Sequence, residues 1–156
     1  MPDVETRLEP KREKMTPPRK RIYEIYSAYA EGQFERLLRD MVDDDITFVS
    51  YAPAEIFPYF KRGQGKAALR QAWEASRADL EFLNYIPLLI VSGDDDTAAA
   101  IVQMRVKRQS TGKVLQLMVA DFLRFRGDRV LEFRQFMDTL DAVQQWMGRQ
   151  IHIPRE

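Results

Sequence analysis

Asp121 is a carboxylate in a stretch of chain that is otherwise apolar at alternate positions. Because side chains of a β-strand point alternately to its two faces, the odd-numbered residues of this stretch share one face. These residues are Leu115, Leu117, Val119, Asp121, Leu123 and Phe125. Burial among apolar neighbours disfavours a charged carboxyl group and raises its pKa. A neutral aspartic acid here could donate a hydrogen bond to a ligand carbonyl or to a developing enolate.

The partner of Asp121 depends on the register of the hairpin that contains it. Residues 126–129 read Arg-Gly-Asp-Arg between two apolar runs, which predicts a tight two-residue turn. In the regular register that follows, Asp121 faces Arg134, and an opposed arginine keeps an aspartate ionised in a salt bridge. The same register sends Gln135 to the other face, and a β-bulge would change both statements. We favour the ion pair, because buried ion pairs are commoner than catalytic acids.

The composition excludes several classes of function. Lysine plus arginine and aspartate plus glutamate number 24 each, so no basic surface for nucleic acid is expected. The chain has no cysteine, which excludes zinc–thiolate sites and thiol nucleophiles, and His152 is its single histidine. The acidic runs 43–45 and 94–96 lack the ligand pattern of a calcium loop. We therefore expect neither a metal nor another cofactor.

The chain is organised as one domain with short extensions. Its 156 residues suffice for a single substantial core. We predict a flexible, proline-containing arm at residues 1–18, the domain at 19–148 and a tail at 149–156. No apolar run approaches the roughly 20 residues that span a bilayer, and the first residues lack an apolar leader. These features predict a cytoplasmic protein without a membrane partner.

Hydrophobic periodicity predicts a mixture of helices and strands. Helical spacing of apolar residues occurs at 19–30, 34–41, 66–80 and 139–147. Strand patterns occur at 46–51, 82–91 and 97–108 and in the two halves of the hairpin at 113–138. Neighbouring strands joined by short loops must be antiparallel. The sequence therefore predicts an α+β domain whose helices pack on one face of a curved antiparallel β-sheet.

Aromatic residues are candidates for the lining of an internal pocket. The proline-rich loop at 52–65 carries Phe57, Tyr59 and Phe60, which are too apolar for an idle surface loop and predict a lid or pocket rim. The full candidate lining is Tyr26, Tyr29, Tyr51, Phe57, Tyr59, Phe60 and Trp73. Each of these residues has a second interpretation as ordinary core, because large aromatic residues are usually buried for packing.

Three segments together resemble a known family. Residues 26–48 (YSAYAEGQFERLLRDMVDDDITF), 62–75 (RGQGKAALRQAWEA) and 121–139 (DFLRFRGDRVLEFRQFMDT) are similar, in order and spacing, to the SnoaL-like or ketosteroid-isomerase-like branch of the NTF2-like superfamily. The resemblance covers about residues 19–146. It implies an NTF2-like (cystatin-like) cone with an apolar pocket, and commonly a homodimer formed through the sheet. This fold hosts isomerases, cyclases, dehydratases, epoxide hydrolases and non-catalytic binding modules, so it does not specify the activity.

The family's catalytic positions are only partly filled. Asp121 falls where ketosteroid isomerases carry the protonated aspartic acid of their oxyanion hole. The general base of those enzymes would fall near Ser50, which is not a carboxylate, and their helix-one tyrosine would fall near Ile25, next to Tyr26. The resemblance therefore implies an acid but no base.

The epoxide-hydrolase branch of the family fits less well. Gln135 stands where those enzymes carry an aspartate, and Arg105 begins a triplet in which Lys107 replaces their second acid. Glutamine cannot deprotonate water, and a lysine inverts the charge. Arg105 and Gln135 still join the candidate pocket residues through this resemblance.

Two functional hypotheses follow from the sequence. Both place a small, largely apolar or carbonyl-containing molecule in the pocket. In the first, the protein is an isomerase- or polyketide-cyclase-like enzyme for proton transfer next to a carbonyl, without a cofactor. Asp121 would be its acid, Arg134 an electrostatic partner, and Tyr26 or Tyr51 a second donor. In the second, it is a non-catalytic homodimeric ligand-binding or assembly module, which the missing base favours.

Overall fold

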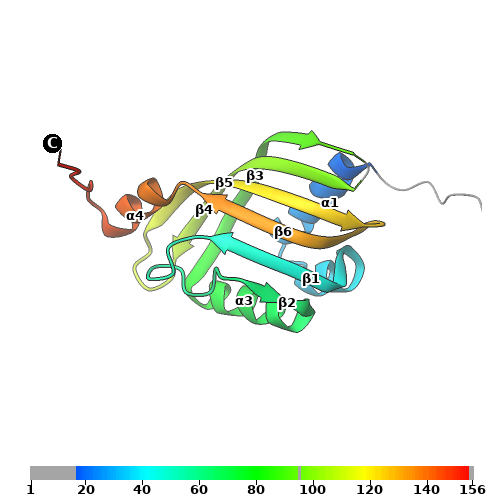
Figure 1. Ribbon diagram of the computed structural model, residues 1–156. Helices are drawn as coiled ribbons and strands as arrows, with labels where there is room; N and C mark the ends of the chain where they lie inside the picture. The colour runs from blue at the N-terminus through cyan, green and yellow to red at the C-terminus, as the bar shows by residue number, and fades with distance from the viewer. Residues whose placement is uncertain (1–16, 95, 155–156) are drawn as a thin grey trace, which may run out of the picture.

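The computed structural model describes residues 17–94 and 96–154. The arm predicted at residues 1–18 lies outside the described residues, apart from its last two. The elements in chain order are α1 (Pro18–Ala30), α2 (Phe34–Arg36), the π-helical turn η1 (Leu37–Met41), β1 (Val42–Tyr51), β2 (Gly63–Gln64), α3 (Gly65–Asp79), β3 (Leu80–Ser92), β4 (Thr97–Arg108), β5 (Val114–Arg126), β6 (Arg129–Met137) and α4 (Thr139–Met147). Figure 1 shows the long strands as one curved sheet with the helices beside it.

The sheet has six strands in the order β2-β1-β6-β5-β4-β3. The predicted α+β class is confirmed. One neighbouring pair, β1 and β6, runs parallel, so the sheet is mixed and not antiparallel throughout as predicted. Short loops enforce antiparallel pairing only between strands that follow one another in the chain. The β1 and β6 strands lie side by side although most of the domain separates them in sequence.

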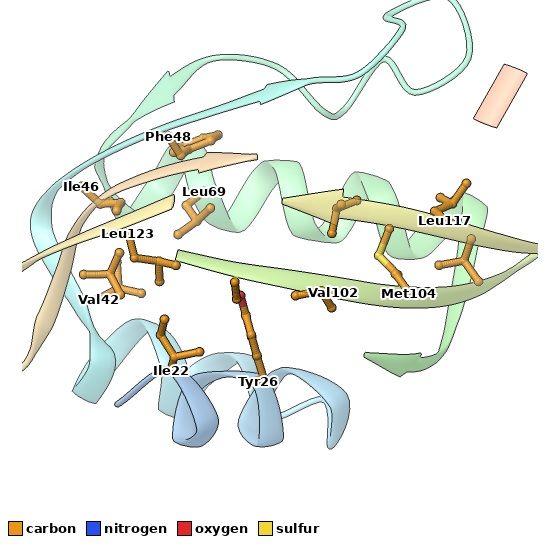
Figure 2. Close-up of a cluster of buried hydrophobic side chains, with 14 of the residues drawn as sticks. Ile22, Tyr26, Val42, Ile46, Phe48, Leu69, Val102, Met104, Leu117 and Leu123 are labelled. Atoms are coloured by element: carbon orange, nitrogen blue, oxygen red, sulfur yellow. The ribbon is translucent and has the colours of Figure 1, made fainter. Parts of the chain in front are cut away.

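The helices α1 and α3 cover the inner face of the sheet (Figure 1). Figure 2 shows Ile22 and Tyr26 of α1 pointing towards the strands, with the Tyr26 ring standing upright between helix and sheet. Leu69 of α3 belongs to the same buried cluster, which continues along alternate residues of β4 and β5. The helical spacing in α1 and α3 thus places their apolar stripes on the sheet, as the periodicity predicts.

Two glycines shape the sheet, Gly127 through its backbone conformation and Gly63 through a close approach. Gly127 has φ 60° and forms the predicted two-residue turn, because Arg126 pairs with Arg129 across the hairpin. At Gly63 a Cβ atom would lie 2.2 Å from the ring of Phe48. A side chain at this position would therefore displace that ring from the core.

The start of β1 differs from the prediction. The strand begins at Val42, four residues before the predicted start at Ile46, and its register with β6 shifts between Val42 and Thr47. The acidic run 43–45 lies within this irregular section. Asp43 is buried there and forms an ion pair with Arg126 at 3.2 Å. The hairpin tip supplies the cation that lets this carboxylate enter a strand.

Candidate functional site

An apolar cavity of about 120 Å³ lies between the inner face of the sheet and helices α1 and α3. Its apolar lining includes Phe48, Leu69, Trp73, Phe82, Met104, Leu123 and Phe133. Its polar lining consists of Tyr26, Tyr29, Ser50, Tyr59, Lys61, Tyr85 and Gln135. Cavities with mostly apolar walls and a few converging polar groups are the usual form of small-molecule sites.

Asp121 lies behind the polar wall of this cavity and is 0% exposed. The hydroxyls of Tyr26 and Tyr85 both donate to its Oδ2, at 2.8 and 2.7 Å. Gln135 Nε2 donates to Oδ1 at 3.0 Å. Three neutral donors thus surround one carboxyl group. The carboxyl itself is not part of the cavity lining, so its influence on a ligand must pass through these donors.

A β-bulge in β6 brings Gln135 to this position. Phe125 pairs with Val130, but Arg124 pairs with Glu132, which leaves Leu131 without a partner. Beyond the bulge Asp121 pairs with Gln135. The predicted regular register, with Asp121 opposite Arg134, is therefore wrong. The inner or outer orientation of each side chain of β6 after Leu131 changes with it, since the period of a strand is two.

Burial dominates the electrostatics of the cluster. Desolvation raises the pKa of Asp121 above its ordinary value, and the hydrogen bonds from Tyr85, Gln135 and Tyr26 oppose this only in part. The pKa of Tyr26 and that of Tyr85 are also raised, first by burial and then by the Asp121 charge. Both tyrosines therefore remain protonated donors, and burial shifts the Asp121 carboxyl group towards its neutral form.

Ser50 and Gln135, the two residues that the resemblance sets at or near base positions, contact each other. Ser50 Oγ donates to Gln135 Oε1 at 3.2 Å. This bond turns the amide nitrogen of Gln135 towards Asp121 and towards the hydroxyl of Tyr85, which it reaches at 3.2 Å. No carboxylate lines the cavity within the described part of the chain. The site thus has a buried acid and no adjacent base.

Six of the sequence-predicted pocket residues line the cavity: Tyr26, Tyr29, Tyr59, Phe60, Trp73 and Gln135. Phe57 is fully buried behind them, where its ring contacts those of Tyr59, Phe60 and Trp146. The loop that follows β1 therefore does fold over the cavity, as its aromatic content predicts.

Three predicted site residues lie on the outer face of the sheet. Tyr51 is 41% exposed and stacks on Phe136 with a centroid distance of 4.5 Å. Arg105 is exposed on β4 and does not line the cavity. Arg134 is bonded to Glu132 at 2.6 Å and does not contact Asp121. Arg134 lies on the outer face because of the bulge in β6. Arg105 lies there because alternate residues of β4, including Arg105, point outward.

Tyr85 is the site residue that sequence reasoning missed. Phe82 and Tyr85 both point inward although they are three residues apart, because the register of β3 shifts between Phe82 and Asn84. Alternation alone places one of them outside.

Tyr29 also lines the cavity, and its hydroxyl makes no hydrogen bond with any residue of 17–94 or 96–154. It is a free donor beside the Asp121 cluster.

No group of three potential metal ligands of the His, Cys, Asp or Glu type occurs among the described residues. Likewise, no helix in the described part of the chain has the length and apolar character needed to cross a membrane.

Comparison with known families and structures agrees with the fold. The SnoaL-like domain family matches residues 22–133. A candidate isomerase from Rhodopseudomonas palustris has 28% identity, with 83% of this chain and 96% of that chain covered and a TM-score of 0.73. No curated protein matches the sequence.

More distant structures share the fold alone. A candidate polyketide cyclase from Pseudomonas putida is 15% identical and covers 83% of this chain and 98% of its own, with a TM-score of 0.71. A protein with a ketosteroid-isomerase-like fold from Catenulispora acidiphila is 14% identical and covers 83% and 93%, with a TM-score of 0.69.

Proposed function

We propose that this chain, which belongs to the SnoaL-like domain family, binds a small, largely apolar molecule that carries a carbonyl group. The observation that carries the proposal is the contrast between the apolar walls of the cavity and the hydroxyl groups in front of Asp121. An apolar ligand body gains free energy by leaving water, and the polar wall fixes its orientation. The cavity volume of about 120 Å³ is close to the roughly 150 Å³ that suffices for a one-ring ligand.

The hydroxyl groups supply the hydrogen bond to the carbonyl. When Asp121 is ionised, Tyr26 and Tyr85 both direct their hydrogens to its Oδ2. When Asp121 is protonated on that oxygen, it donates to one tyrosine, whose own hydrogen is then free to turn to the ligand. Oδ1 stays occupied by Gln135 in both states. Tyr29 offers a donor that does not depend on Asp121.

The test compares two ligands that share a benzene ring and a two-carbon side chain. Acetophenone and ethylbenzene differ in the carbonyl oxygen, and their binding can be followed by titration in methyl NMR spectra through Met104 and Leu123, which line the cavity. We expect acetophenone to bind more tightly by roughly fivefold, the worth of about one neutral hydrogen bond. Tyr29→Phe should reduce that preference, since it removes the free donor.

Tyr51→Phe is the matched control, because it removes a hydroxyl from the outer face of the sheet. It should leave both affinities unchanged. Absence of binding by both molecules would refute the proposal, and an equal effect of the two variants would refute the role of Tyr29.

A second candidate function is proton transfer next to that carbonyl. The position of Asp121 behind Tyr26 and Tyr85 and the rise of its pKa on burial favour it, because a protonated carboxyl group there, acting through the tyrosine hydroxyls, stabilises the negative charge that develops on an enolate oxygen. The 28% identical candidate isomerase supports the same direction. Water would have to remove the proton, since no described lining residue is a carboxylate.

Exchange of the methyl protons of acetophenone in deuterium oxide tests the second candidate directly. The enzyme hypothesis expects exchange above the rate in buffer, and a fall of about tenfold or more in Asp121→Asn. Exchange at the buffer rate leaves binding as the function and eliminates catalysis.

For the assembly we propose a homodimer formed through the outer face of the sheet. That face exposes Tyr51, Phe122 and Phe136 to 41%, 49% and 44%. Their rings form one aromatic cluster across β1, β6 and β5. Large exposed apolar patches are usually contact surfaces. Sedimentation at micromolar concentration should give twice the chain mass, and a monomeric mass would refute the dimer.

A further inference from the structure

Lys61 differs from every other residue of the cavity lining. It is the one charged side chain among the lining residues that the structure describes, and the one whose exposure is high. All the others are buried or half-buried. An exposed residue can contribute to a cavity wall only where the cavity meets solvent. Lys61 therefore marks the mouth of the cavity.

The charge at this mouth is not neutralised by the protein. Neither Lys61 nor the following Arg62 forms an ion pair with any residue in 17–94 or 96–154. Lys66, five residues after Lys61, by contrast pairs with Asp44 at 2.6 Å. Lys61 also follows Tyr59 and Phe60, whose rings line the cavity and contact each other at 4.7 Å. The packed rings hold the backbone of Lys61 beside the opening.

We propose that the ligand is an amphiphilic acid whose apolar body fills the cavity and whose anionic group meets Lys61 at the mouth. The inference rests on the proposed function and narrows its ligand class. Apart from Lys61, the cavity walls have no cationic group for an anion, because they are apolar or carry neutral hydroxyl and amide groups. The buried Asp121 would also repel a second negative charge while it is ionised. An anion is consequently stable only at the lysine end.

Two probes that share a ring and a carbonyl separate this inference from the proposed function. Acetophenone is the neutral probe, and 4-acetylbenzoate adds a carboxylate at the end opposite the carbonyl. In the full chain at neutral pH, 4-acetylbenzoate should bind roughly fivefold more tightly, as a partly desolvated charge-assisted contact allows. The gain should shrink as salt is added, because the mouth is open to solvent.

Lys61→Gln should remove the gain, so that 4-acetylbenzoate binds no more tightly than acetophenone. Lys113→Gln is the matched control, since it makes the same charge change outside the cavity lining. Equal affinity of the two probes, or a gain that survives Lys61→Gln, would overturn the inference while leaving the proposed function intact. Failure of both probes to bind would overturn the proposed function and the inference together.

Discussion

Two carboxylates on the hairpin of β5 and β6 lie on opposite faces of the sheet in opposite environments. Asp121 is fully buried on the inner face and accepts hydrogen bonds from two tyrosines and a glutamine. Glu132 lies on the outer face between Arg124 and Arg134, at 2.8 and 2.6 Å. The pKa of Asp121 is raised by desolvation, whereas hydrogen bonds from the two arginines lower that of Glu132.

The register of the hairpin determines which partners each of these two carboxyl groups has, and the partners determine its pKa. Arg134 can contact only one of the two carboxylates. Because Leu131 is unpaired, Arg134 lies on the outer face, where it contacts Glu132. Asp121 receives Gln135 instead, which carries no charge. A carboxyl group with neutral partners in an apolar wall holds its proton to higher pH than an exposed one. One with cationic partners is an ordinary surface ion pair.

The largest expected effect comes from removing the inner carboxyl group. Asp121→Leu keeps the number and branching of the side-chain heavy atoms but leaves Tyr26, Tyr85 and Gln135 without their common acceptor. Each buried donor left unsatisfied costs about 1–3 kcal/mol, and the tyrosines can partly turn to the cavity. We expect a loss of about 3 kcal/mol in the free energy of unfolding, measured by urea denaturation.

Glu132→Leu is the counterpart on the outer face. It should destabilise the protein less, because Arg124 and Arg134 are half-exposed and can be solvated instead. A loss in Asp121→Leu no greater than that in Glu132→Leu would contradict the contrast between the two faces.

The second expected effect is an opposite pH dependence at the two carboxylates. The pKa of Asp121 is raised in the folded state, so between the unfolded value of about 3.9 and the folded value the native protein holds the extra proton. Its contribution to stability is thus greatest at low pH and is lost as pH rises through the folded pKa. The limiting slope is about 1.4 kcal/mol per pH unit.

Glu132 should show the reverse sign. Its folded pKa is lowered, so its contribution is present above the unfolded pKa and is lost as pH falls. Urea denaturation across pH should therefore show wild type losing stability relative to Asp121→Asn as pH rises, and gaining relative to Glu132→Gln. Differences of the same sign in both comparisons would show that the environment assigned to Asp121 is wrong.

The fold was predictable from the sequence because its elements have strong periodic signals. The strand Thr97–Arg108 and the helix Thr139–Met147 have the predicted bounds, and alternation places Asp121 inward on β5. Asp138 caps the last helix by accepting from the Asp141 amide at 3.1 Å, as its position suggests. The order of the strands in the sheet was not predictable in the same way. The parallel pairing of β1 and β6 joins segments that are distant in sequence, so no local sequence pattern indicates it.

The site was predictable only in part, because two bulges shift the parity on which the argument depends. The irregularity in β3 turns Tyr85 inward, and the one in β6 replaces Arg134 by Gln135 beside Asp121. A single extra residue reverses the face of everything that follows it. Nothing in the residue types at Leu83 or Leu131 announces a bulge, since neither is a glycine.

The smallest expected effect tests this exchange of partners. Arg134→Gln removes a half-exposed cation that contacts Glu132, which keeps its bond to Arg124 at 2.8 Å. Stability in urea should fall only slightly, and the difference should vanish near about 1 M salt, where surface charges are screened. The titration of the Asp121 carboxyl carbon, followed by NMR, should be unchanged, because Arg134 lies on the other face of the strand. If that titration moves to higher pH in Arg134→Gln, the arginine interacts with Asp121 after all, and the regular hairpin register describes the protein in solution better than the bulged one.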